Sequence, residues 1–163
     1  MSRTLKRYHT LLKPLREVPA QVYLGKEIHL AGLLSWILDQ TGQAEVIVTT
    51  FSTSDDFLCA FRRLRDDGLI KHAVLVADFK ASQKTKNIRL LMKNSFDRIF
   101  FAENHSKLML VRREDMTVTV ITSQNQTYGG RNESTFITAD NDTYWSLHNT
   151  LFDIIQNHSV ESL

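Results

Sequence analysis

Residues 45–79, EVIVTTFSTSDDFLCAFRRLRDDGLIKHAVLVADF, combine two strand-like segments with a helical pattern between them. Glu45 to Phe51 is rich in β-branched residues and predicts a first strand, and Lys71 to Phe79 predicts a second, apolar enough to lie inside a sheet. Ser54 is placed to cap the intervening helix, whose apolar residues recur at helical spacing until Gly68. The order strand, helix, strand predicts an α/β layer with parallel pairing.

The same alternation continues on both sides of this segment and then gives way to shorter strands. Helices are predicted at residues 28–38, 82–94 and from 142 onward, and strands at residues 97–102, 106–111, 117–122 and 133–138. We expect one domain over residues 1–163, with an N-terminal helical extension at 1–44 and a core at 45–163. The expected fold class is α/β, with a mixed, largely parallel β-sheet flanked by helices.

Composition and cysteine content favour an intracellular globular protein. The 163 residues are 42% hydrophobic and 23% charged, which is typical of globular domains. The single cysteine, Cys59, excludes an internal disulfide and lies in a helical pattern that predicts a buried thiol. No apolar run approaches the length of a membrane span, and no apolar stretch follows the basic N-terminus as in a secretory signal. We therefore expect a cytoplasmic location and no membrane partner.

Positive charge is concentrated in two parts of the chain, although the formal net charge is only +2. Residues 1–26 and 80–98 are strongly basic, whereas the region after Arg113 is comparatively acidic. Separated charge of this kind suits a polyanion, and a solvated helix face accounts for it equally well. The residues expected to contact a nucleic acid are Lys84, Lys86, Arg89, Lys93 and Arg131.

The residues best suited to chemistry lie in three short segments between residues 104 and 133. They are Asn104–Lys107 (NHSK), Ser123–Asn125 (SQN) and Gly129–Glu133 (GGRNE). If His105 and Lys107 belong to a strand, their side chains point to the same side, and the SQN segment ends the partner strand. A nucleophile, a cation and neutral hydrogen-bonding groups at one place suit a phosphate, whose oxygens gain charge in the transition state.

This ordered set resembles the phospholipase D superfamily, with a single His-x-Lys block as in its nuclease-like branch. The resemblance implies a half-unit of that fold and a phosphodiesterase mechanism that needs neither metal nor cofactor. In that mechanism His105 acts as nucleophile or acid through a phosphohistidine intermediate, and Lys107 and Asn125 bind phosphate oxygens. Glu133 would support the imidazole, and Ser123 matches the small hydroxyl residue of the second block.

Two further expectations follow from the resemblance. Since the mechanism requires two histidines and the chain has one block, we expect a homodimer in which the two copies of His105 meet at the two-fold axis. The substrate expected is DNA or RNA, without a preference between them. Against this, Arg112 stands where the family usually has an aspartate, with Asp115 as a replacement carboxylate to be tested. The alternative is therefore a catalytically inactive binding or assembly module with the same fold.

Overall fold

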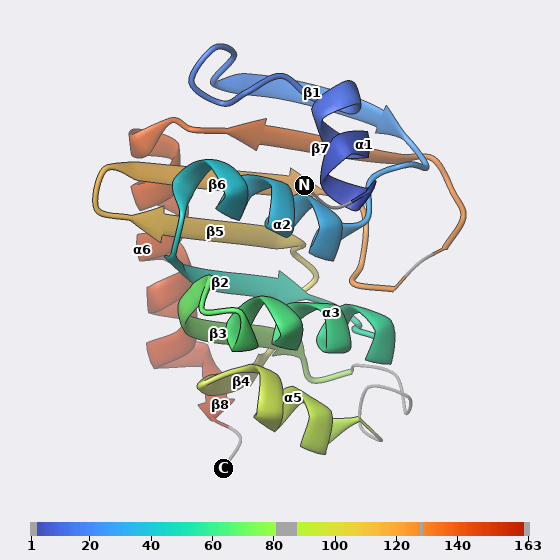
Figure 1. Cartoon of the computed structure of the whole chain (residues 1–163). Coiled ribbons are helices and arrows are strands. Elements are labelled where there is room, and N and C mark those ends of the chain that lie inside the picture. The colour runs from blue at the N-terminus through green and yellow to red at the C-terminus, as the bar shows by residue number, and fades with distance from the viewer. Residues whose placement is uncertain (1–2, 81–87, 128, 162–163) are drawn as a thin grey trace.

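The computed structural model describes residues 3–80, 88–127 and 129–161, and its strands form one mixed sheet (Figure 1). The strands follow the order β1-β7-β6-β5-β2-β3-β4-β8. Their bounds are Ala20–Gly25 (β1), Ala44–Thr50 (β2), Ile70–Asp78 (β3), Arg98–Ala102 (β4), Leu108–Arg113 (β5), Met116–Thr122 (β6), Glu133–Thr138 (β7) and Ser159–Glu161 (β8). The helices are Arg3–Leu11 (α1), Leu30–Thr41 (α2), Asp55–Asp66 (α3), Arg89–Ser95 (α5) and Asn141–His158 (α6).

The sheet confirms the predicted α/β class but contains less parallel pairing than expected. Strands β2 and β3 are parallel, as are β3 and β4, and this is the segment in which strands and helices alternate. Every other neighbouring pair of described strands is antiparallel. The reason is the hairpin of β5 and β6, after which the chain returns as β7 beside β6 without a crossover helix.

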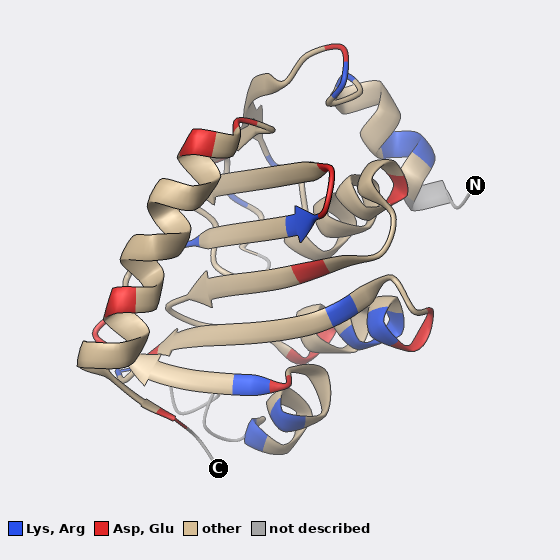
Figure 2. Ribbon diagram, turned by 90° about the vertical axis from the view of Figure 1, so that its left-hand side faces the viewer, with Lys and Arg blue, Asp and Glu red and all other residues tan. Residues whose placement is uncertain are grey.

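Helices cover both faces of the sheet and bury two groups of apolar side chains. Figure 2 shows α6 lying across one face, with α2, α3 and α5 on the other. The α2 and α3 side carries the larger core, in which Leu33, Trp36 and Phe61 are fully buried. Under α6, Tyr144 and Leu151 pack in a smaller cluster with buried residues of β3, β4 and β5. Each face of the sheet is thus covered, as in other α/β folds.

The helix that follows β2 begins and ends where the sequence predicts. The Ser54 side chain accepts a hydrogen bond of 3.3 Å from the Phe57 N–H, which satisfies one free donor of the first turn of α3. At the other end, Gly68 has a φ of 75°, in the left-handed region that glycine adopts without cost. Cys59 on this helix is exposed, so the expectation of a buried thiol is wrong. It lies on the side of α3 that faces away from the core.

The N-terminal segment is not helical throughout, because residues 20–25 form an edge strand. Strand β1 pairs antiparallel with β7, from Ala20 opposite Thr138 to Gly25 opposite Glu133. Helices α1 and α2 flank it in sequence, and α2 ends at Gly42 with a φ of 78°. Residues 1–44 therefore contribute a strand to the sheet as well as helices.

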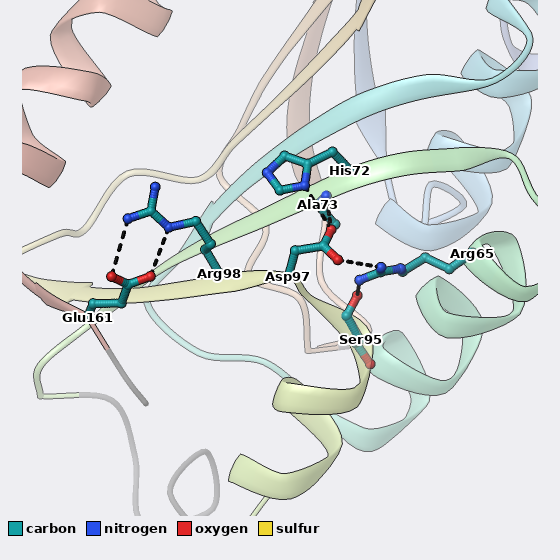
Figure 3. A network of polar contacts seen from close by, with 7 residues as sticks. All are labelled: Arg65, His72, Ala73, Ser95, Asp97, Arg98 and Glu161. Atoms are coloured by element: carbon teal, nitrogen blue, oxygen red, sulfur yellow. Dashed lines mark hydrogen bonds and ion pairs between the residues drawn. The ribbon is translucent and has the colours of Figure 1, made fainter.

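A polar network joins α3 to the part of the sheet in which β3 and β4 begin (Figure 3). The Asp97 carboxylate accepts hydrogen bonds from Arg65 Nη2 at 2.6 Å and from the Ala73 N–H at 2.7 Å. Arg98 holds β8 by donating to Glu161 at 2.8 and 3.2 Å. Burial opposes ionisation of Asp97, but the bonds from Ala73 and Arg65 outweigh it and hold the pKa of this carboxyl below its ordinary value. This end of the sheet is therefore fixed by charge-assisted contacts.

Candidate active site

His105 lies in the connection between β4 and β5, where the carboxyl ends of the parallel strands meet. Residues 104–107 are not part of a strand, so the strand-based reason for the His105–Lys107 pairing is wrong. The two side chains nevertheless meet, with Lys107 Nζ 3.3 Å from His105 Nδ1 and donating to the His105 main-chain oxygen at 2.8 Å. The imidazole is exposed, and its ring centroid lies 5.2 Å from that of Phe51 at the end of β2.

Buried polar groups near the ends of β2 and β3 hold the segment that contains His105 in place. Asp78, at the end of β3, accepts a hydrogen bond of 2.9 Å from the Asn104 N–H. Thr49 Oγ1 accepts from the Leu108 N–H at 2.9 Å and lies 2.8 Å from Ser106 Oγ, which in turn donates to the Asn104 side chain. Thr49, Asp78 and Asn104 are all buried. Since hydroxyl groups both donate and accept, the network leaves few choices of conformation to the segment that carries His105.

Ser123 and Glu133 lie beside this segment and bind each other. The Thr122 N–H donates to the Lys107 main-chain oxygen at 3.1 Å, which brings the end of β6 next to Lys107. Ser123 donates to the Glu133 carboxylate and accepts from the Ser134 N–H at 3.1 Å. Among the described residues no hydrogen bond joins Glu133 to His105, so support of the imidazole by Glu133 remains a prediction.

Asn125 lies at the edge of a cavity of about 760 Å³ between α1, α2, α3 and residues 124–127. Its Oδ1 is buried and has no hydrogen-bond partner among the described residues. The neighbouring Gln126 donates from its main-chain N–H to the Ser52 main-chain oxygen at 3.2 Å, and Ser54 Oγ donates to the Gln126 main-chain oxygen at 2.9 Å. Residues 51–54 therefore contact both places, because Ser54 lines the cavity and the Phe51 ring lies beside that of His105.

Arg112 lies at the opposite end of β5 from His105. It donates to Glu45 Oε2, with Nη2 at 2.5 Å, and its guanidinium lies 5.5 Å from the centre of the Trp145 ring. The hydrogen bond from Arg112 holds the pKa of the Glu45 carboxyl below its ordinary value. Asp115 forms ion pairs with Arg113 and Arg16 at 3.4 and 3.9 Å, so it does not replace a carboxylate at the site. Arg112, which stands where the family usually has an aspartate, thus forms an ion pair that is separate from the His105 site.

The basic residues proposed for nucleic-acid contact are exposed where the structure describes them. Arg89 and Lys93 lie on α5, and Arg131 precedes β7. Arg89 also places its guanidinium 5.4 Å from the centre of the Phe101 ring. Lys84 and Lys86 lie outside the described residues. Of the three that the structure describes, Arg89, Lys93 and Arg131, none bonds to His105.

Sequence reasoning found the segment with His105 but missed much of its surroundings. Thr49 and Asp78 lie near the ends of two predicted strands, and a polar residue close to the end of an apolar run was the available signal. No pattern in the sequence indicates Gln126, because its importance depends on contact with residues more than seventy positions away. In the described part of the chain, no helix is long and apolar enough to cross a membrane, and no group of three or more His, Cys, Asp or Glu side chains could hold a metal ion.

Comparisons with known proteins identify the fold. No family model and no curated sequence matches the chain. Its structure is similar to that of Nuc from Salmonella typhimurium, a phospholipase D family member, with a TM-score of 0.64 and 14% identity over 88% of this chain and 98% of Nuc. Polyphosphate kinase from Porphyromonas gingivalis is similar with a TM-score of 0.62 and 16% identity, over 96% of this chain and 29% of the kinase.

Two other solved structures extend the comparison. Phosphatidylserine synthase from Haemophilus influenzae has a TM-score of 0.54 and 11% identity, over 88% of this chain and 39% of the synthase. TrmBL2, an archaeal chromatin protein, has the same TM-score of 0.54 at 9% identity, over 94% of this chain and 59% of TrmBL2. The chain is therefore an α/β protein with the fold of the phospholipase D superfamily. It spans nearly all of Nuc.

Proposed function

We propose that this protein is a metal-independent phosphodiesterase, a nuclease that cleaves DNA or RNA through a phosphohistidine in a homodimeric site. The observation that carries the proposal is the exposed His105 with Lys107 Nζ 3.3 Å from its Nδ1, held on a buried polar network. An exposed histidine beside a cation is accessible to a phosphate, and a fixed main chain reduces the entropy lost in positioning it. The phospholipase D fold supports the same class of chemistry.

The reaction would use two copies of His105 in different protonation states. One imidazole attacks phosphorus, so that a P–N bond forms and the P–O bond to the leaving group breaks. The second imidazole, from the partner subunit, gives its proton to the leaving oxygen and then takes one from the water that hydrolyses the phosphohistidine. Lys107 and Asn125 would bind the oxygens that gain charge.

The position of Lys107 affects which copy of His105 attacks phosphorus and which copy protonates the leaving oxygen. An ammonium that donates to Nδ1 requires the neutral ring to carry its proton on Nε2, and this form must gain a second proton, on Nδ1, before it can protonate a leaving oxygen. A phosphate that draws Lys107 toward its own oxygens frees Nδ1 to hold the proton instead. Nε2 is then free to attack. Substrate binding to one subunit would thus distinguish two identical histidines.

A nucleic acid is the proposed substrate because several cations are exposed on the surface. Arg89, Lys93 and Arg131 are exposed, and they could bind the phosphates on either side of the one that is cleaved. Binding of this kind weakens steeply as salt concentration rises. This salt dependence distinguishes a polyanionic substrate from a small phosphodiester.

A second candidate is a non-catalytic module that binds nucleic acid. Two observations favour it: among the described residues no carboxylate contacts the His105 imidazole, and TrmBL2, described as a chromatin protein with a novel mode of DNA binding, shares the fold. Without a carboxylate, the imidazolium formed during proton transfer is less stabilised. The homodimer or the substrate would have to supply that charge in a catalyst.

Cleavage in the presence of a chelator distinguishes the two candidates. Purified protein should cleave labelled single- or double-stranded DNA or RNA in EDTA, and His105→Ala should abolish cleavage without loss of folding. His158→Ala, at an exposed histidine on α6, is the matched control and should cleave normally. Mass spectrometry of quenched reactions should find a nucleotide adduct on His105. Tight binding with neither cleavage nor adduct between pH 5 and 8 would support the non-catalytic candidate.

A further inference from the structure

An apolar row crosses four neighbouring strands at one edge of the sheet. Directly opposed residues of β1, β7, β6 and β5 form this apolar row, which consists of Val22, Phe136, Ile121 and Leu108. Residues that are directly opposite in a sheet point to the same side, so the four side chains share one face. Val22 is 76% and Ile121 39% exposed, and Leu24, two residues after Val22 on the same face, is 74% exposed. A contiguous exposed apolar surface of this kind marks a place that another molecule covers.

The apolar row lies on the α6 side of the sheet, beyond the part that α6 covers. Leu110, two residues after Leu108, points the same way and packs in the cluster that holds Tyr144 and Leu151 of α6. The other buried members of this cluster come from β3 and β4, and α6 ends where β8 begins, at the opposite edge of the sheet from β1. Among the described residues, none of β1, β7 or β6 belongs to the cluster. Helix α6 therefore leaves this side of β1, β7 and the end of β6 open to solvent.

The segment that carries His105 crosses the end of the sheet on this same face. Thr49 alternates along β2 with Val48, which belongs to the core under α2 and α3, so Thr49 points to the α6 side. Its Oγ1 lies 2.8 Å from Ser106 Oγ and accepts from the Leu108 N–H at 2.9 Å. In the order of the strands, His105 is therefore flanked by the apolar row over β1 to β5 and by the C-terminal part of α6 over β3, β4 and β8.

The thickness of α6 limits what can reach the apolar row. Helix α6 lies on the same face, across the neighbouring strands (Figure 2), and a helix with its side chains is about 10–12 Å across. A second sheet that approached this face would be held away from the row by α6, whereas a helix could lie beside α6 in the same layer. Helix α6 itself presents an apolar side chain to solvent: Phe152 is 50% exposed, and its ring stacks on that of His148 at a centroid distance of 6.4 Å.

From this geometry we infer that α6 of a second copy of the chain covers the apolar row, and that this reciprocal contact brings the two copies of His105 together. A two-fold axis beside His105 exchanges the two sides of the face, so the row of each subunit meets the helix of the other. Because symmetry repeats the contact, both rows and both helices count toward the roughly 800 Å² per partner that a stable interface buries. This inference rests on the proposed function, since the shared site is the reason for placing the axis beside His105.

The test replaces exposed apolar residues by glutamine, which leaves the charge around the phosphate site unchanged. The row variant, Val22→Gln/Leu24→Gln, is compared with Val160→Gln/Leu90→Gln. These control positions lie on β8 and α5, on the other side of the sheet, and are 62% and 74% exposed. In sedimentation equilibrium the control should dimerise as the wild type does. The dissociation constant of the row variant should rise about 100-fold, or about tenfold for each amide buried against an apolar helix.

Phe152→Gln tests whether α6 is the element that covers the row. It should weaken the dimer by about tenfold, although it lies outside the row. When it is combined with Val22→Gln, the loss should be smaller than the product of the two separate losses, because both substitutions remove parts of the same contact. An unchanged dimer in Phe152→Gln, or losses that multiply in full, would overturn α6 as the partner of the row.

The dependence of cleavage on protein concentration separates loss of the dimer from loss of the fold. Well below its raised dissociation constant, the row variant should not cleave, because each His105 lacks its copy. Well above that concentration, its rate per subunit should return to that of the wild type. A row variant that stays inactive as a verified dimer would show that the row acts on the site directly, and would overturn the inference.

The failure of this inference and that of the proposed function are distinguishable. Cleavage by a dimer that is as tight in the row variant as in the wild type would overturn this interface and leave the nuclease intact. Dimers that only the row and Phe152 variants weaken, without cleavage by any of the proteins, would support the interface and overturn the nuclease. A wild-type protein that is monomeric at every concentration up to its solubility limit would overturn the inference.

Discussion

Lys107 Nζ lies 3.3 Å from Nδ1 of His105 and donates a hydrogen bond of 2.8 Å to the main-chain oxygen of the same residue. The ammonium is thus held beside the imidazole before any substrate arrives. A phosphate oxygen can replace either of these contacts without a change in the main chain. The relationship is therefore a resting arrangement from which Lys107 can move to substrate.

Lys107→Met should remove a positive charge from the phosphate site while keeping the length of the side chain. We expect kcat/KM to fall about 10²- to 10³-fold, the cost typical of losing one group that stabilises developing charge. Lys93→Met removes the same charge at an exposed position on α5 and should change the rate only a few-fold. Initial rates in EDTA at two salt concentrations measure both effects. Equal losses in the two variants would mean that Lys107 acts only through general electrostatic attraction.

A site shared by two copies of His105 makes a quantitative prediction for mixed subunits. If wild-type and His105→Ala chains exchange freely, activity should follow the square of the wild-type fraction, about a quarter of the maximum in an equal mixture. A site complete within one chain should give a straight line instead. Titration of His105→Ala into wild type after co-refolding, with sedimentation to verify dimers, measures this dependence. A linear result from a verified dimer would contradict the shared site.

The pairing of Arg112 with Glu45 predicts what restoring the family's usual aspartate would do. Arg112→Asp puts two carboxylates together at the end of the sheet remote from His105, so stability should fall by about 1–2 kcal/mol without a gain in activity. Arg112→Met is the neutral control and should lose less. Urea unfolding and chelator-resistant cleavage are the two measurements. Increased cleavage by Arg112→Asp would show that the position acts on the site after all.

The same pair gives a pH dependence whose sign is fixed. The hydrogen bond from Arg112 lowers the pKa of Glu45 below its ordinary value of 4.5 in the folded protein. The stabilisation is therefore present above pH 4.5 and is lost as pH falls through the lower folded pKa. The stability difference between wild type and Arg112→Met should be full at pH 7 and vanish well below pH 4.5. Thermal unfolding of both proteins across this range measures it, and a difference that grows at low pH would contradict it.

The sequence predicts most of the parallel segment because local signals there agree with the tertiary structure. Strand composition, the Ser54 cap and Gly68 all describe elements whose apolar residues face the core. Strand β1 was missed because its pattern is reversed: Val22 and Leu24 are 76% and 74% exposed, whereas Gln21 and Tyr23, which alternate with them, are half-buried. An edge strand held by main-chain bonds to β7 does not need an inward apolar face.

The candidate site was predictable only as far as it is local in sequence. His105 and Lys107 are two residues apart, so their meeting could be expected even though the strand assignment was wrong. The groups that hold them come from elsewhere: Thr49 is 57 positions from Ser106, and Asp78 is 26 positions from Asn104. No periodicity connects such residues. Their contacts exist because the ends of β2, β3 and β5 are neighbours in the sheet.

Asp78→Asn tests whether the buried network positions His105 or only stabilises the fold. The two oxygens of Asp78 accept from the Lys80 N–H at 2.6 Å and from the Asn104 N–H at 2.9 Å. An asparagine offers one oxygen and turns an NH₂ group toward the other donor, which should cost about 1–3 kcal/mol. Asp153→Asn, at an exposed position on α6, is the control and should cost less than about 0.5 kcal/mol.

The two roles of Asp78 differ in kinetics measured where the variant is still folded. If Asp78 positions the Asn104–Lys107 segment, kcat of Asp78→Asn should fall about tenfold or more with KM little changed, because the phosphate is still bound but the imidazole is misplaced. A purely structural role predicts a lower melting temperature and unchanged kcat below it. Because Asp78 contacts the main chain of Asn104 rather than His105, any loss of kcat would have to arise from a displacement of the Asn104–Lys107 segment. A loss of kcat with unchanged stability would therefore show that the rigidity of this loop is part of catalysis.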